Sequence, residues 1–169
     1  LPADAVTYEV QAKTIPTRVE VVGSTTSEER INLSARIPAY VREVFASAGD
    51  RVKKGQVVVT LDDRDIRQQL AGAEAQLNQA QTEYSRAKTL MEKQATTQQA
   101  LTAAESMYNA AQAQVEQVKV MLTYAQVESP IDGIVTERRI EAGDLANPGT
   151  LLLAVYDPAR MRLEAPVPV

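Results

Sequence analysis

Residues 35–63 read ARIPAYVREVFASAGDRVKKGQVVVTLDD, and residues 129–157 read SPIDGIVTERRIEAGDLANPGTLLLAVYD. Aligned without a gap at a constant offset of 94, the two segments share eight identities in 29 positions. Three identities are contiguous, in Ala48-Gly49-Asp50 and Ala142-Gly143-Asp144. A repeated segment usually marks two copies of one supersecondary unit, each of which needs its neighbour to bury an apolar face. The repeat therefore predicts one domain built from two similar halves.

Each copy has the pattern of a strand, a turn and a second strand. β-Branched runs such as Val57-Val58-Val59 suit a pleated, half-buried surface. Gly49 and Gly55 supply positive φ at low cost, and Asp50 can hydrogen-bond its own backbone in a turn. We expect the two copies to form a small β-sandwich.

The segment between the copies, residues 64–128, changes to a helical period. Its apolar residues step alternately by four and three, which places them on one stripe of a helix. Two such stripes flank Gln94 to Gln99, where adjacent threonines favour a cap or a turn. We expect an antiparallel coiled-coil hairpin with arms of roughly 45 Å, at 1.5 Å per residue. The expected seam comprises Ile66, Leu70, Ala73, Leu77, Ala80, Tyr84, Ala87 and Met91 on the first arm, and Leu101, Ala104, Tyr108, Ala111, Val115, Val118, Leu122 and Ala125 on the second.

Both ends of the chain alternate in polarity. The segments around 18–22 and 161–169 predict strands with one buried face. We expect residues 1–34 and 158–169 to be the beginnings of an incomplete β-barrel domain, and the chain to be truncated within that domain.

Composition limits the classes of function. The net charge is −4 with no basic stripe, which argues against a nucleic-acid partner, and no stretch is long and apolar enough to span a membrane. The chain has no His and no Cys, so an ordinary catalytic triad, a thiol nucleophile and a nitrogen or sulfur metal cluster are excluded. Asp62, Asp63 and Asp65 lie where a strand gives way to a helix, and we interpret them as capping residues. We expect that the chain is not an enzyme and binds no cofactor, although its composition does not exclude a metal site built from carboxylates.

The repeat resembles the two halves of a biotinyl-lipoyl carrier domain, in which a tight turn between the halves presents a modified lysine. Here the helical insert takes that place, and Lys88, Lys93 and Lys119 lie within it. A lipoyl-like sandwich split by a helical hairpin resembles the periplasmic adaptor (membrane fusion protein) subunits of Gram-negative tripartite efflux pumps, over roughly residues 8 to 169. The segments Gly49 to Gln56 and Ser129 to Gly133 match the family closely. The implied fold is α+β: two lipoyl-like halves, the hairpin, and incomplete β-barrel strands at both ends.

The resemblance also implies a site at the hairpin tip. The family signature there is an Arg, a Leu four residues on, and a Ser seven further; Arg86 and Leu90 fit, while Thr97 replaces the Ser. These residues would dock an outer-membrane channel. The missing β-domains would hold an inner-membrane transporter, and copies would self-associate into a ring, expected to be hexameric. The implied location is the periplasm, with attachment to the inner membrane through an N-terminal anchor missing from this chain.

Several alternatives stay open. The modest two-helix hairpin favours an adaptor of resistance-nodulation-division pumps, but adaptors of ATP-driven exporters and secretion systems share the same parts. In other classes, the chain could be a lipoyl or biotinyl carrier-like protein or a coiled-coil scaffold. The exported substrate, whether a drug, a metal or another compound, is not readable from these residues.

Overall fold

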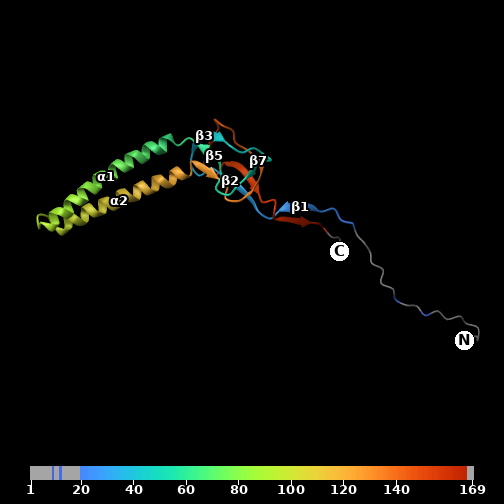
Figure 1. Cartoon of the computed structure of the whole chain (residues 1–169), viewed down its shortest axis with the longest axis horizontal. Helices are drawn as coiled ribbons and strands as arrows, with labels where there is room; N and C mark the ends of the chain where they lie inside the picture. Colours follow the sequence, from blue (N-terminus) through green and yellow to red (C-terminus); the bar gives the residue numbers. More distant parts are fainter. Residues whose placement is uncertain (1–8, 10–11, 13–19, 167–169) are drawn as a thin grey trace, which may run out of the picture.

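The molecule is elongated, with a β-sandwich between a long helical hairpin and a small two-stranded ribbon (Figure 1). This arrangement comes from a computed structural model that describes residues 9, 12 and 20–166. The hairpin leaves one end of the sandwich, and the ribbon lies at the opposite end (Figure 1). The predicted α+β class with a split sandwich is confirmed.

The sandwich has two four-stranded sheets in which all neighbouring strands are antiparallel. Their buried side chains form one core, to which both copies of the repeat contribute. The first sheet has the order β2 (Arg30–Ser34), β9 (Leu151–Tyr156), β7 (Gly133–Arg138) and β4 (Arg51–Val52). The second has the order β6 (Gln126–Glu128), β5 (Val57–Leu61), β3 (Ala39–Val44) and β8 (Leu145–Ala146).

The two halves are related by a pseudo-twofold axis, which the backbone hydrogen bonds display directly. The N–H of Gly49 donates to the carbonyl of Val135 at 2.8 Å, and the N–H of Gly143 donates to the carbonyl of Val41 at 2.8 Å. Gly143 lies 94 residues after Gly49, and Val41 lies 94 residues before Val135, so the second pair is the first with the halves exchanged. Each half therefore extends a sheet of the other, and neither half completes its sheets alone.

The Gly-Asp turns explain why these glycines and aspartates recur. Gly49 has φ of 94° and Gly143 has φ of 95°, a left-handed conformation that a Cβ disfavours. The carboxylate of Asp50 accepts a hydrogen bond from the N–H of Ser47 at 2.8 Å, and that of Asp144 accepts one from Glu141 at 2.9 Å. The predicted turn role of both Gly-Asp pairs is confirmed.

The repeat extends further toward its N-terminal side than the identities indicate. Residues 32–34 of β2 correspond to residues 126–128 of β6 at the same offset, and each strand forms the edge of its sheet. β2 therefore belongs to the sandwich, in which Leu33 is buried, and not to an incomplete barrel as expected for residues 1–34. Likewise β6 is a sandwich strand, so the hairpin ends at Thr123 and not at the expected boundary of 128.

The helices follow the predicted seam closely. α1 (Arg64–Glu92) and α2 (Gln98–Thr123) pack antiparallel, and every residue of α1 that is not fully exposed belongs to the predicted stripe. In α2 the seven predicted positions from Leu101 to Leu122 are also covered, and Met121 joins them. Ala125 is the exception, because it follows the helix and is buried in the sandwich core.

The terminal ribbon differs in detail from the expectation. β1 (Ser24–Ser27) pairs antiparallel with β10 (Met161–Glu164). A strand was expected around residues 18–22, but residues 20–22, the described part of that segment, form none. Val19, Val167 and Val169 lie outside the described residues. The expectation of one buried face is wrong for β10, whose four residues are all exposed, because no described element packs on the ribbon.

Gly133 provides a test of how tightly the first sheet is packed. A Cβ at this position would overlap with the backbone carbonyl oxygen of Tyr156, which cannot withdraw without distorting the ladder between β7 and β9. We expect Gly133→Ala to lower the free energy of unfolding by about 1 to 3 kcal/mol, the usual cost of overpacking. Urea denaturation followed by circular dichroism measures this change.

The matched control is Gly72→Ala in α1, where a Cβ would meet nothing within 4 Å. That substitution should stabilise the helix by roughly 0.5 to 1 kcal/mol, because Gly is the more flexible residue. Equal effects of the two substitutions would contradict the steric explanation of Gly133.

Candidate functional site at the hairpin tip

The hairpin is anchored most firmly at its root, the end nearest the sandwich. Ala73, Val115 and Val118 are buried in the seam there. Ile66 packs against both this cluster and the sandwich core. Farther out, seam residues are only partly covered, and the rings of Tyr84 and Tyr108 stack with centroids 5.6 Å apart.

Charged residues pair with one another where β5 gives way to α1. Asp62 accepts hydrogen bonds from both the backbone N–H and the Nε of Arg64, at 3.1 and 3.0 Å. These bonds, the side-chain bond foremost, lower the pKa of Asp62 to about 2. The Nε of Arg67 donates to Asp63 at 2.8 Å and lowers the pKa of that carboxyl as well.

The capping expectation for this acidic cluster needs one correction. Asp63 occupies the N-cap position of α1, but its side chain makes no capping hydrogen bond because Arg67 engages it. Asp62 instead accepts the N–H of Arg64 in the first turn of the helix. Asp65 lies in that turn, where a carboxylate interacts favourably with the helix dipole.

The tip is a short turn that ends α1 by a Schellman motif. The N–H of Ala95 donates to the carbonyl of Leu90 at 2.8 Å, and the N–H of Gln94 donates to that of Met91 at 2.9 Å. Gln94 adopts the left-handed conformation with φ of 55°, a position that Gly usually occupies. The turn thus satisfies the last carbonyls of α1 while holding a non-glycine residue in a strained conformation.

Thr97 begins the second helix as its N-cap. Its side-chain oxygen accepts a hydrogen bond from the N–H of Ala100 at 3.2 Å, as the adjacent threonines predict. Capping uses the hydroxyl as an acceptor and leaves its hydrogen free to donate. The same hydroxyl can therefore cap α2 and donate to a partner.

Arg86 lies on α1, about 9 Å along the helix axis before the last residue of that helix, at 1.5 Å per residue. Its side chain is 63% exposed, and Nη1 donates to both carboxylate oxygens of Glu83, at 3.0 and 3.2 Å. Among the described residues, no hydrogen bond engages its Nε or Nη2. Glu83 thus engages one nitrogen of the guanidinium and leaves most of its donors to solvent. The sequence pattern did not reveal this ion-pair partner of Arg86.

The structure brings two of the three predicted tip residues onto one face. Arg86 and Leu90 are four residues apart on α1, so their side chains are neighbours on the helix surface. Leu90 is 38% exposed, outside the seam that contains Met91. Thr97 lies across the turn, and no hydrogen bond among the described residues joins it to the other two.

A shallow groove on the flank of the hairpin is a feature that sequence reasoning missed. It has a volume of about 770 Å³ and is lined by five alanines of α2, by Ala80 and Glu83 of α1, and by glutamines of both helices. Met107 lies within it and is 68% exposed. The signal was present in the alanine spacing of the seam, because small side chains at the helix contact leave the flank hollow.

Other chemistries find little support in the described part of the chain. No group of three or more carboxylates among these residues is placed to hold a metal ion. Neither α1 nor α2 has the length and apolarity needed to cross a membrane. Lys88 and Lys119 lie on the helices and Lys93 caps α1, so none of these three lysines lies in a tight turn that joins the two halves of the sandwich.

Comparison with known proteins agrees with the sandwich and hairpin described above. Residues 29–157 match the protein family described as CzcB-like, barrel-sandwich hybrid domain. The multidrug resistance protein MexA of Pseudomonas aeruginosa is 28% identical over 153 residues, which cover 88% of this chain and 40% of MexA. SrpA of Pseudomonas putida, a solvent efflux pump periplasmic linker, is 26% identical over 148 residues, covering 88% of this chain and 39% of SrpA.

A solved structure agrees in fold. The chimeric protein of MacA that contains the MexA α-hairpin domain of Pseudomonas aeruginosa superposes with a TM-score of 0.81, at 27% identity, over 87% of this chain and 54% of that chain. The chain spans about two fifths of the length of the curated relatives it matches. The expectation that it is not an enzyme is confirmed by these relatives, which are efflux components.

The ion pair at the root predicts a specific titration. Because Arg64 stabilises the ionised form of Asp62, the folded-state pKa is depressed, and its stabilising effect is present above the ordinary value of 3.8 and lost as the pH falls through about 2. We expect carboxyl NMR to show Asp62 titrating at about 2 in the native chain and at a higher pH in Arg64→Ala, which loses the side-chain hydrogen bond but keeps the one from the backbone N–H. Arg67→Ala is the control, since it should release Asp63 and leave Asp62 unchanged.

The capping role of Thr97 is separable from any docking role. We expect Thr97→Ala to lower the free energy of unfolding by about 1 kcal/mol, whereas Thr97→Ser should leave it nearly unchanged because Ser retains the accepting oxygen. Urea denaturation measures both variants. A loss in Thr97→Ser as large as that in Thr97→Ala would show that the methyl group, and not the cap, stabilises the turn.

Proposed function

Because this chain belongs to the periplasmic adaptor (membrane fusion protein) family of efflux pumps, through its CzcB-like barrel-sandwich hybrid domain, we propose that it bridges an inner-membrane transporter and an outer-membrane channel. The observation that carries the proposal is the hairpin itself. It extends from the sandwich, against whose core Ile66 packs, and its far end exposes Arg86 and Leu90. The hairpin tip docks the channel.

The proposed role is mechanical. α1 has 29 residues and α2 has 26, so the two arms reach roughly 40 Å from the sandwich at 1.5 Å per residue. Neither helix contains Pro, and the one glycine, Gly72, is near the root. A stiff rod of this kind holds its tip at a defined distance and angle from the sandwich, which a bridge between two membrane proteins requires.

The tip chemistry suits the end of another helix. The free Nε and Nη2 of Arg86 can donate to the carbonyls that a helix C-terminus leaves unpaired, or to a carboxylate. Leu90 adds an apolar contact one turn farther along α1. The hydroxyl hydrogen of Thr97 supplies a further donor across the turn.

The remaining parts of the proposal follow from the family. The protein acts in the periplasm and is attached to the inner membrane through an N-terminal anchor. Further β-domains contact a transporter of the resistance-nodulation-division type, which supplies the energy. Several copies, six in this proposal, self-associate into a ring whose hairpins lie side by side.

A charge reversal at the tip tests the docking role. We expect Arg86→Asp to weaken channel binding at least tenfold, since hydrogen bonds to a charged group contribute about 1.5 to 3 kcal/mol. In the full-length protein in its native host, tolerance to exported drugs or solvents should fall to that of a strain lacking the adaptor. Growth at graded concentrations of a panel of drugs, solvents and divalent metals measures this, and immunoblotting verifies the amount of adaptor.

Lys119→Asp is the matched control. Lys119 pairs with Glu116 at 3.0 Å with the same spacing of three residues, so reversing its charge creates the same local repulsion near the root of the hairpin. Tolerance should be retained in this variant. Unchanged tolerance in Arg86→Asp, or an equal loss in both variants, would refute docking through Arg86.

A further inference from the structure

A pocket of about 400 Å³ lies on the sandwich beside the root of the hairpin, far from the tip. Residues of β2 and β6 line it, together with the end of α2. β2 is an edge strand of the first sheet and β6 is an edge strand of the second. Neither strand pairs with a second strand in the described part of the chain, so the open edges of both sheets border this one pocket.

The backbone of these two edges presents unpaired hydrogen-bonding groups. The N–H of Asp157 donates to the carbonyl of Glu29 at 3.0 Å, and bonded and non-bonded pairs alternate along an antiparallel ladder. Asn32 therefore turns both its N–H and its C=O away from β9. The carbonyl of Ala125 accepts from Leu61 at 2.8 Å, so Gln126, the equivalent of Asn32 at the offset of 94, likewise turns away from β5. Such groups are a template for another strand.

Two charged side chains lie at opposite ends of the pocket. The guanidinium carbon of Arg36 lies 5.1 Å from the centroid of the Tyr124 ring, just before β6 begins. Glu128, at the other end, is the last residue of β6. Neither Arg36 nor Glu128 forms an ion pair with a described residue. Leu33 and Val127 add apolar lining between these charges.

We propose that an extended segment of another protein adds to β2 as a further strand in this pocket. Strand addition combines main-chain hydrogen bonds to an open edge with recognition of alternate side chains. A segment antiparallel to β2 meets Arg36 first and Glu128 last, so it carries an acidic residue followed by a basic one. The reverse order would bring like charges together. This interaction goes beyond the bridging role proposed above and uses no part of the tip.

A short synthetic peptide tests this surface directly. The probe is fluorescein-labelled Glu-Val-Thr-Val-Lys with both ends blocked. Its Glu and Lys share one side of a strand, and its two valines share the other, which suits a pocket with charged ends and an apolar lining. With the purified full-length protein, we expect saturable binding by fluorescence anisotropy and slower amide hydrogen exchange in β2 by mass spectrometry.

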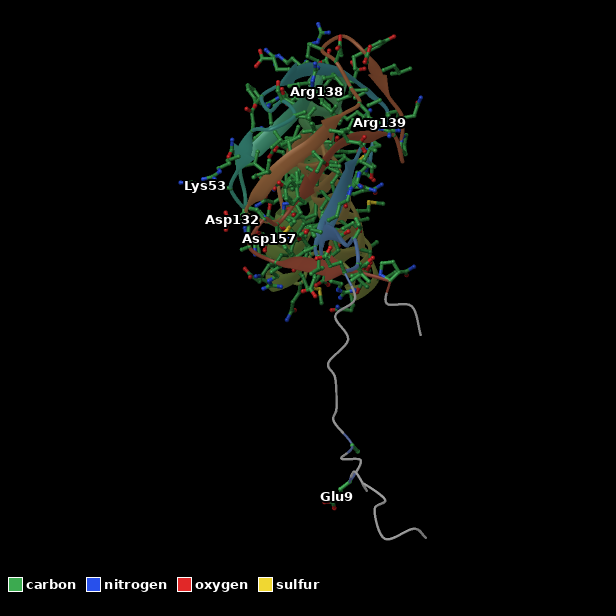
Figure 2. All side chains as sticks on the ribbon, turned by 90° about the vertical axis from the view of Figure 1, so that its right-hand side faces the viewer. Glu9, Lys53, Asp132, Arg138, Arg139 and Asp157 are labelled. Carbon is green, nitrogen blue, oxygen red and sulfur yellow. The ribbon has the colours of Figure 1, made fainter. Side chains whose placement is uncertain are left out.

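Two changes separate the contributions of charge and backbone. Arg36→Glu should weaken binding at least tenfold, because repulsion replaces attraction to the Glu of the peptide. The matched control is Arg51→Glu on β4, at the opposite edge of the same sheet, which should bind as the native protein does. Figure 2 shows Lys53, which directly follows β4, on the side of the sandwich away from β2 (blue). A peptide N-methylated at its three central amides keeps every side chain but loses those donors, and it should also bind at least tenfold more weakly.

Several outcomes would overturn the proposal. These are the absence of saturable binding by the unmodified peptide, and equal binding by the native protein and Arg36→Glu. Equal binding of the N-methylated peptide would assign the pocket to a small charged ligand instead of a strand. Dissociation of self-associated protein by the peptide, measured by light scattering, would assign the edge to a second copy. Because the assay contains no transporter or channel, its failure is distinguishable from a failure of tip docking.

Discussion

The architecture depends on the exchange of backbone hydrogen bonds between the two Gly-Asp turns. Each glycine N–H reaches across the pseudo-twofold axis to a strand of the opposite half, at Val135 in one direction and Val41 in the other. Both turns need positive φ, which glycine adopts without the steric cost of a Cβ. Since each half supplies an edge strand to the other half's sheet, the sandwich forms only when both halves are present, however far apart they lie in the sequence.

That exchange explains how a long insert is tolerated. The hairpin connects β5 to β6, which are already antiparallel neighbours in one sheet. The N–H of Leu61 donates to the carbonyl of Ala125 at 2.8 Å, directly below the two helices. The insert therefore occupies the place of a turn between adjacent strands, and the sheet continues beneath it without interruption.

Much of the fold could be predicted from the sequence, wherever identity between the two repeats or the period of the apolar residues carried the information. The eight identities placed both Gly-Asp turns, and the stepping by four and three placed the seam of α1 residue by residue. The strands β2 and β6 were missed as repeat members because their equivalent residues, 32–34 and 126–128, share no identity. Their pairing is set by the tertiary structure, in which backbone hydrogen bonds and burial suffice without matching side chains.

The tip shows where local patterns are insufficient. Arg86, Leu90 and Thr97 were identified by resemblance, but the partner of Arg86 and the conformation of Gln94 were not. A helix end with Gly in the left-handed position is recognisable in a sequence, whereas Gln gives no such signal. The role of Asp63 was misassigned for a similar reason, because Arg67 competes for its carboxylate from one turn farther along α1.

The unequal burial along the seam has a consequence for motion. Buried contacts concentrate near the root, at Ala73, Val115 and Val118, while the outer seam is only partly covered and the turn contains a strained Gln94. Free energies of local opening follow the number of buried apolar contacts, so backbone amides should exchange with solvent fastest at the tip and slowest at the root. Local opening of the hairpin should therefore be easiest at its tip and hardest at its root.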